Sequence, residues 1–206
     1  MEKAKMTEKE SLELISQMIQ STKEKINPRS GNRFLIYGYM AVFISLTIFA
    51  LSLFTQSGAW NMIWMLMFVP QAYLYFKDKS GKSDVVTYTD RMILNTWFII
   101  GSLFSLTFAL IIIIGIIFGY HVDYSIMLPL SLLYAGIGTA ITGVIIKEPG
   151  LIYTPLIGFI FAIYMLISQS SGDASSIYWN LYFGFSMIAM MVIPGHILNN
   201  KAQRSC

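Results

Sequence analysis

Residues Ser131 to Gly150 read SLLYAGIGTAITGVIIKEPG, an apolar stretch that is crowded with glycine, alanine and threonine. On a helix with about 100° between successive residues, the large side chains share one face. In a bilayer, helices associate where small residues let their backbones approach closely. The pattern therefore predicts that this segment packs against several neighbours in the middle of a helix bundle. The small residues that form the packing face are Ser131, Ala135, Gly136, Gly138, Thr139, Ala140, Thr142 and Gly143.

A second, weaker row of small residues lies upstream, in Gly101, Ser105 and Ala109. Its i, i+4 spacing predicts a complementary packing face on another helix. A substrate path lined by the small residues of 131–143 is the alternative interpretation of that face.

The composition of the chain is that of a membrane protein. Of its 206 residues, 55% are hydrophobic and only 12% are charged, and the mean hydropathy is +0.61. Apolar segments of about 17 to 27 residues are long enough to cross a hydrocarbon core roughly 30 Å thick. We predict an all-α polytopic membrane helix bundle over residues 34–195, with about six transmembrane helices at 34–55, 60–76, 92–118, 124–146, 150–168 and 177–195.

The distribution of Lys and Arg predicts how the chain is threaded. Seven of these residues precede the first span, four lie in or beside the 77–91 loop, Lys147 lies in the next turn on that side, and two are in the tail 196–206. Together these are all fourteen in the chain, and the three intervening connections carry none. Cytoplasmic loops hold the excess of basic residues, so both termini are expected in the cytoplasm. The net charge of +3 then reflects topology, and no nucleic-acid partner is expected.

Residues 1–33 form the one sizeable polar segment, a predicted cytoplasmic amphipathic helix and linker. Thr7-Glu8-Lys9-Glu10 fits a capping box at a helix start, and the helix is expected to end before Pro28. A helix this short is marginal in water, so its apolar stripe needs a partner. The stripe lies on the membrane surface or under the bundle, or it docks a cytoplasmic protein or a second copy of the chain. The docking candidates are Leu12, Ile15, Ile19 and Ile26.

Residues that would carry catalysis or bind a metal do not cluster in this sequence. The two histidines, His121 and His196, are predicted on opposite sides of the membrane. Asp90 and Arg91 fall at a span boundary, whereas coupled transporters normally keep an ionisable residue at membrane depth. We therefore expect no catalytic residue, no cofactor and no metal.

Four segments carry a resemblance to a known family: SGNRFLIYGY at 30–39, VVTYTDR at 85–91, LLYAGIGTAITGVI at 132–145 and IPGHILNNKAQRSC at 193–206. With the arm pattern at 10–19, they resemble a family of uncharacterised six-span integral membrane proteins from Bacteroides-type bacteria. The resemblance implies a multi-pass protein of the bacterial inner membrane. No activity is known for that family, so the resemblance transfers no functional residue.

Two functions from different classes follow from these features. The first is a non-enzymatic regulatory or scaffold protein that acts through its cytoplasmic arm, loop and tail. The alternative is a channel or facilitator for a small uncharged solute, which would need a continuous polar cavity through the bundle. An intramembrane enzyme ranks third.

Overall fold

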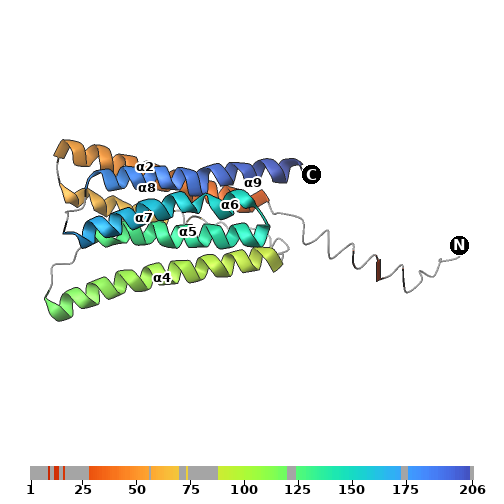
Figure 1. Ribbon diagram of the computed structural model, residues 1–206, viewed down its shortest axis with the longest axis horizontal. Coiled ribbons are helices and arrows are strands. Elements are labelled where there is room, and N and C mark those ends of the chain that lie inside the picture. Colours follow the sequence, from red (N-terminus) through yellow and green to blue (C-terminus); the bar gives the residue numbers. More distant parts are fainter. Residues whose placement is uncertain are drawn as a thin grey trace.

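The computed structural model describes residues 9, 12–13, 16, 28–55, 57–69, 73, 88–119, 124–172 and 176–204. This described part is all-α and forms an elongated bundle with its helices lying side by side (Figure 1). In chain order the elements are α2 (Pro28–Thr55), the 3-10 helix η1 (Gly58–Met67), α4 (Tyr88–Phe118), the 3-10 turn η2 (Tyr124–Ile126), α5 (Met127–Ile146), α6 (Pro149–Tyr153), α7 (Pro155–Ser170), α8 (Tyr178–Met187), the π-helical turn η3 (Ile188–Val192) and α9 (Ile193–Arg204).

Five stretches of the described residues are long and apolar enough to cross a membrane: Gly31–Thr55, Tyr88–Phe118, Tyr124–Ile146, Pro149–Ser170 and Tyr178–Asn200. They coincide with five of the six predicted spans, which confirms the class of polytopic helical membrane protein. The remaining prediction, 60–76, falls on η1 and on residues that lie mostly outside the described part.

Two helix boundaries differ from the predicted ones. Helix α2 begins at Pro28, so residues 28–33, predicted as a linker, belong to the first helix. Proline is favoured at a helix start because its missing N–H would have no partner there. At the other end of the chain, α9 continues to Arg204, so residues 196–204 extend the last helix instead of forming a separate tail.

Helix α2 runs antiparallel to the last span and begins at the same end of the bundle as α4. Along α2, Gly31 lies against Asn199 and Gly38 lies against Met191, so α2 runs opposite to the segment from α8 to α9. The rings of Phe34 and Trp97 are 5.7 Å apart, which places the beginnings of α2 and α4 at the same end of the bundle. The chain between Thr55 and Tyr88 must therefore return from one end to the other, and η1 follows that direction (Figure 1).

The last span is interrupted in its middle by a π-helical turn that has a cause in the sequence. Pro194 has no N–H to donate, and its ring crowds the carbonyl one turn earlier. The Ile193 N–H instead reaches the Ile188 carbonyl, five residues back. This widened turn directs Met190 onto Gly158 of α7 and Met191 onto Gly38 of α2.

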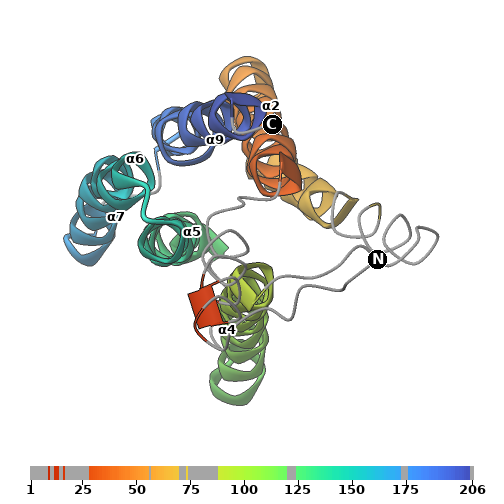
Figure 2. The same ribbon diagram turned by 90° about the vertical axis from the view of Figure 1, so that its right-hand side faces the viewer.

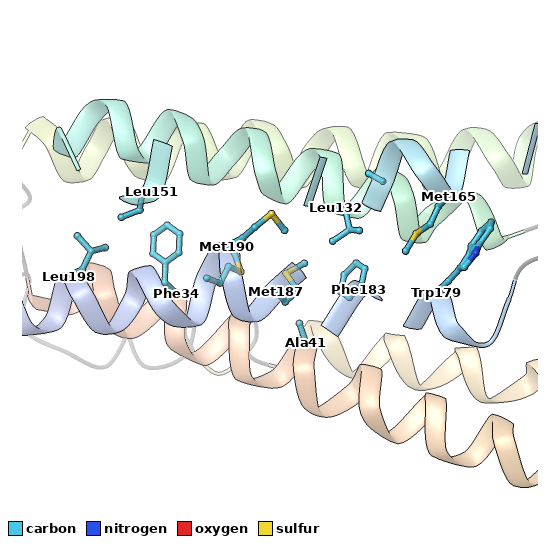
Figure 3. Close-up of a cluster of buried hydrophobic side chains, with 12 residues drawn as sticks. Phe34, Ala41, Leu132, Leu151, Met165, Trp179, Phe183, Met187, Met190 and Leu198 are labelled. Atoms are coloured by element: carbon cyan, nitrogen blue, oxygen red, sulfur yellow. The ribbon is translucent and has the colours of Figure 1, made fainter. Parts of the chain in front are cut away.

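A continuous apolar core follows the length of this last span (Figure 3). In the most apolar stretch of the last span, 61% of the residues are buried, against 39% in that of the span Tyr124–Ile146. The most central position, expected for the fourth span, therefore belongs to the last one. Small side chains let helices approach closely, but the core forms where large buried ones converge. They include Phe34, Leu132, Leu151, Met165, Trp179, Phe183, Met187, Met190 and Leu198.

Helix α4 stands at the edge of the bundle, mainly beside α5 (Figure 2), and it meets α2 at the ring contact between Trp97 and Phe34. Only 11% of the residues in its most apolar stretch are buried. Gly101, Ser105 and Ala109 are all exposed, and no described atom lies within 4 Å of a side chain added at Gly101. The prediction that this row packs against α5 was wrong, because α4 meets α5 through larger residues on another face, beginning with Trp97.

Candidate functional site

Charged residues gather at one end of the bundle, which we call the charged end. It holds Arg33 at the start of α2, Asp90 and Arg91 at the start of α4, and Lys147 and Glu148 between α5 and α6. These positions come together because α2 and α4 begin where α5 and α9 finish. At the opposite end, the described residues around 55–58, 118–124 and 170–178 carry no charge.

The turn at the charged end is built by local hydrogen bonds. Lys147 adopts a left-handed conformation with φ of 60°, which stops α5. Its N–H donates to the Val144 carbonyl and the Glu148 N–H donates to the Gly143 carbonyl, a pairing typical of helix C-termini. The carboxylate residue Glu148 then precedes α6 and is only 7% exposed. The sequence alone does not distinguish Glu148, because charge in a short turn usually faces solvent.

Two side-chain pairs join the first and last helices near the charged end. The Asn199 Nδ2 donates to the Asn32 Oδ1 at 2.7 Å. One turn earlier along α9, the His196 Nε2 is 2.7 Å from the Tyr39 hydroxyl of α2. Neither pair can be predicted from the sequence, because their members lie more than 150 positions apart and no local spacing connects them.

The predicted packing face of 131–143 lies against neighbouring helices. Gly136, Gly138, Thr139, Thr142 and Gly143 are buried, and the remaining members are half-buried: Ser131, Ala135 and Ala140. The opposite face, with Ile137, Ile141 and Val144, is exposed.

Side chains and backbone from three helices occupy the space beside these small residues. A Cβ added to Gly136 would lie 2.6 Å from the Phe159 ring of α7, and one added to Gly138 would lie 3.3 Å from the Trp97 indole of α4. At Gly143 the added atom would lie 2.8 Å from the backbone of Leu151 and Ile152 in α6. Protein atoms, and not an open path, therefore face the small residues at these three positions.

A polar contact is also buried near the uncharged end. The Ser45 hydroxyl of α2 donates to the backbone carbonyl of Asn180, a residue that is 6% exposed. Within the described part of the chain its Oδ1 has no hydrogen-bond partner, and neither does the buried Nε1 of Trp64.

The amphipathic arm is described at a few positions. Leu12 is helical and 67% exposed. The other predicted docking residues, Ile15, Ile19 and Ile26, lie outside the described residues.

Histidine, cysteine and acidic side chains do not converge as metal ligands among the described residues.

Comparisons of the chain with protein-family models, with curated proteins and with solved structures returned no match. The resemblance to the Bacteroides-type family therefore stays a prediction, and the charged end, built from four helix ends, is the candidate site that the geometry offers.

Proposed function

We propose that this protein is a non-enzymatic regulatory or scaffold protein of the bacterial inner membrane that acts through its charged end. A single observation carries the proposal: Arg33, Arg91 and Lys147, which come from separate parts of the chain, lie at the same end of the bundle. Basic residues accumulate on the cytoplasmic side, so this end faces the cytoplasm together with both termini.

The proposal includes a sixth crossing. Helices α2 and α4 begin at the same end, so the residues between Thr55 and Tyr88 must traverse the bundle once more. The apolar segment 60–76 supplies the residues for that crossing. An even number of crossings puts the arm and the end of α9 on the same side as the 77–91 loop, where a cytoplasmic partner can contact all three.

The channel or facilitator is the weaker candidate. Its path would run along the small-residue face of α5, and Phe159, Trp97 and Leu151 stand against that face. A solute would have to displace these side chains, which are packed between helices. A partner acting at the charged end needs no such rearrangement.

The experiment is deletion of residues 1–26, compared with the full chain after extraction from native membranes. Helix α2 begins at Pro28, so the deletion leaves the described bundle intact. We expect unchanged membrane insertion and thermal stability, together with loss of a co-purifying cytoplasmic protein or of a second copy, measured by quantitative mass spectrometry and by particle mass in detergent.

A matched pair of full-length variants tests whether the apolar stripe itself docks the partner, without shortening the chain. Leu12→Asp with Ile19→Asp places two charges on the apolar stripe and should reproduce the loss. Gln17→Asp with Gln20→Asp places the same charge on the polar side of the helix and should not. A truncated chain that misfolds, or that keeps every partner of the full chain, would contradict the regulatory role.

A further inference from the structure

The segment η1 is a 3-10 helix of ten residues at the start of the predicted span 60–76. Runs of 3-10 helix longer than three or four residues are uncommon, because their hydrogen bonds are poorly aligned and side chains three positions apart eclipse one another. Directly after η1, Phe68 and Val69 are α-helical. The chain therefore changes helix type inside one apolar segment, and its 3-10 part has the less favourable geometry of the two.

The side chains of η1 that face the bundle are spaced as in an α-helix. Every described side chain from Ala59 to Val69 is exposed except four half-buried ones, which are Trp60, Ile63, Trp64 and Met67. With about 100° between successive residues, these four share a sector about 100° wide that contains none of the exposed residues. With the roughly 120° of a 3-10 helix, they fall on two rows that also hold exposed residues such as Leu66. An α-helical η1 would therefore keep the same four side chains against the bundle.

The start of η1 is anchored by two hydrogen bonds. The Ala59 N–H donates to the Ser57 hydroxyl at 3.3 Å, and the Trp60 Nε1 donates to the Thr55 hydroxyl at 2.6 Å. Both bonds connect η1 to the residues that follow the end of α2 or close it. A change of helix type within η1 would therefore move its far end and leave its start in place.

The far end of η1 is held more weakly among the described residues. The Trp64 ring lies edge-on to the Phe183 ring with centroids 4.7 Å apart, but the buried Nε1 of this tryptophan has no hydrogen-bond partner. Beyond η1, the side chains of Phe68, Val69 and Tyr73 are more than half exposed. Burial of these three side chains therefore does not oppose a movement of the chain that follows η1.

Conversion to an α-helix would shorten η1. Ten residues rise about 20 Å as a 3-10 helix and about 15 Å as an α-helix. The difference of about 5 Å is close to the difference in hydrocarbon thickness between thin and thick cell membranes. Since η1 follows the long axis of the bundle (Figure 1) and exposes Met62, Met65 and Leu66, its length is matched against the surrounding lipid. Mismatch between a span and the bilayer costs free energy, so bilayer thickness favours one of the two lengths.

We propose that η1 responds to bilayer thickness, being a 3-10 helix in a thick bilayer and an α-helix in a thin one. The change brings Phe68 about 5 Å closer to the start of η1 and turns the chain that follows about the helix axis. Membrane thickness then sets the position of the chain that runs from η1 toward the charged end. The proposal rests on the sixth crossing of the function proposed above, and it requires no protein partner.

The test is the distance between spin labels on Ser57→Cys and Val69→Cys, in a Cys206→Ser background, measured by double electron–electron resonance. The full chain is reconstituted in dimyristoleoyl phosphatidylcholine for a thin bilayer and in dierucoyl phosphatidylcholine for a thick one. Both labelled positions are exposed, and their distance should be about 5 Å longer in the thick bilayer. The matched control is Phe98→Cys with Leu110→Cys, an exposed pair with the same sequence separation in α4, whose distance should not change.

A second measurement needs no substitution. The dipeptide Asn61-Met62 occurs once in the chain, so carbonyl-¹³C asparagine combined with ¹⁵N methionine labels a single peptide bond inside η1. Solid-state NMR should resolve two carbonyl signals for this bond, one for each helix type. The ratio of their intensities should change between the two bilayers.

Equal label distances in the two bilayers would overturn the proposal, because the span would then adapt by tilting. A longer distance in the thin bilayer, or an equal change in the control pair, would overturn it as well. If the labelled variant does not fold, an NMR intensity ratio that is independent of thickness has the same meaning. A missing sixth crossing is recognised separately, since Ser83→Cys would then be labelled from outside intact cells, and that result would refute the crossing and this proposal together.

Discussion

The glycines of this bundle differ in what lies beside them: helix backbone, a flexible side chain or open space. Gly143 faces the backbone of Leu151 and Ile152, which cannot move without displacing α6. Gly158 faces the end of the Met190 side chain, which has several rotatable bonds. Gly101 faces open space in α4. The cost of adding one methyl group should therefore depend on the neighbour and not on burial alone.

Alanine substitution should follow that order. Gly143→Ala should destabilise the protein most, by about 1–3 kcal/mol, because overpacking against backbone forces the helices apart. Gly158→Ala should cost less, because Met190 can change rotamer. Gly101→Ala should be neutral or stabilising, because alanine favours the helix more than glycine. Thermal unfolding in detergent measures the series, and equal melting temperatures for Gly143→Ala and Gly101→Ala would mean that the face of α5 is not closely packed.

At the scale of elements, α4 is attached to the bundle mainly through α5. The Trp97 Nε1 donates to the Thr142 hydroxyl at 3.2 Å, and the hydroxyls of Thr107 and Tyr134 are 2.8 Å apart. Thr142 also donates to the Gly138 carbonyl of its own helix. A residue chosen as a small packing element thus also provides a hydrogen bond between spans.

Thr142→Val should loosen α4 selectively. The substitution keeps the shape but leaves the indole N–H of Trp97 without its acceptor in apolar surroundings, which costs about 1–3 kcal/mol. Hydrogen exchange should become faster in α4 and little changed in α2 and α8. Thr96→Val is the control, because the Thr96 hydroxyl bonds only to Met92 within α4. Faster exchange spread evenly over all helices would contradict this role of Thr142.

For the whole molecule, the sequence predicts the membrane class, and five of its six predicted spans coincide with long apolar helices, because long apolar segments between charged clusters leave few alternatives. The sequence does not rank the spans by burial. The π-helical turn before Pro194 redirects Met190 and Met191, and their burial depends on which helices lie against them. The exposed row at Gly101 shows the same limit: helical spacing identifies a face but not its neighbour. Glu148, Tyr39 and His196 were missed at the candidate site because their surroundings come from distant parts of the chain.

The most direct test of the account is the side of the membrane on which single cysteines can be labelled, because the proposed role requires every part of the charged end to be cytoplasmic. In intact cells, a membrane-impermeant maleimide should label Ser57→Cys and Ser176→Cys, each in a Cys206→Ser background. It should reach Lys147→Cys in that background, and the native Cys206, only after the membrane is opened. Labelling of Cys206 from outside while Lys147→Cys stays protected would show that the two lie on opposite sides, and labelling of both from outside would reverse the orientation. Either result would contradict a cytoplasmic charged end.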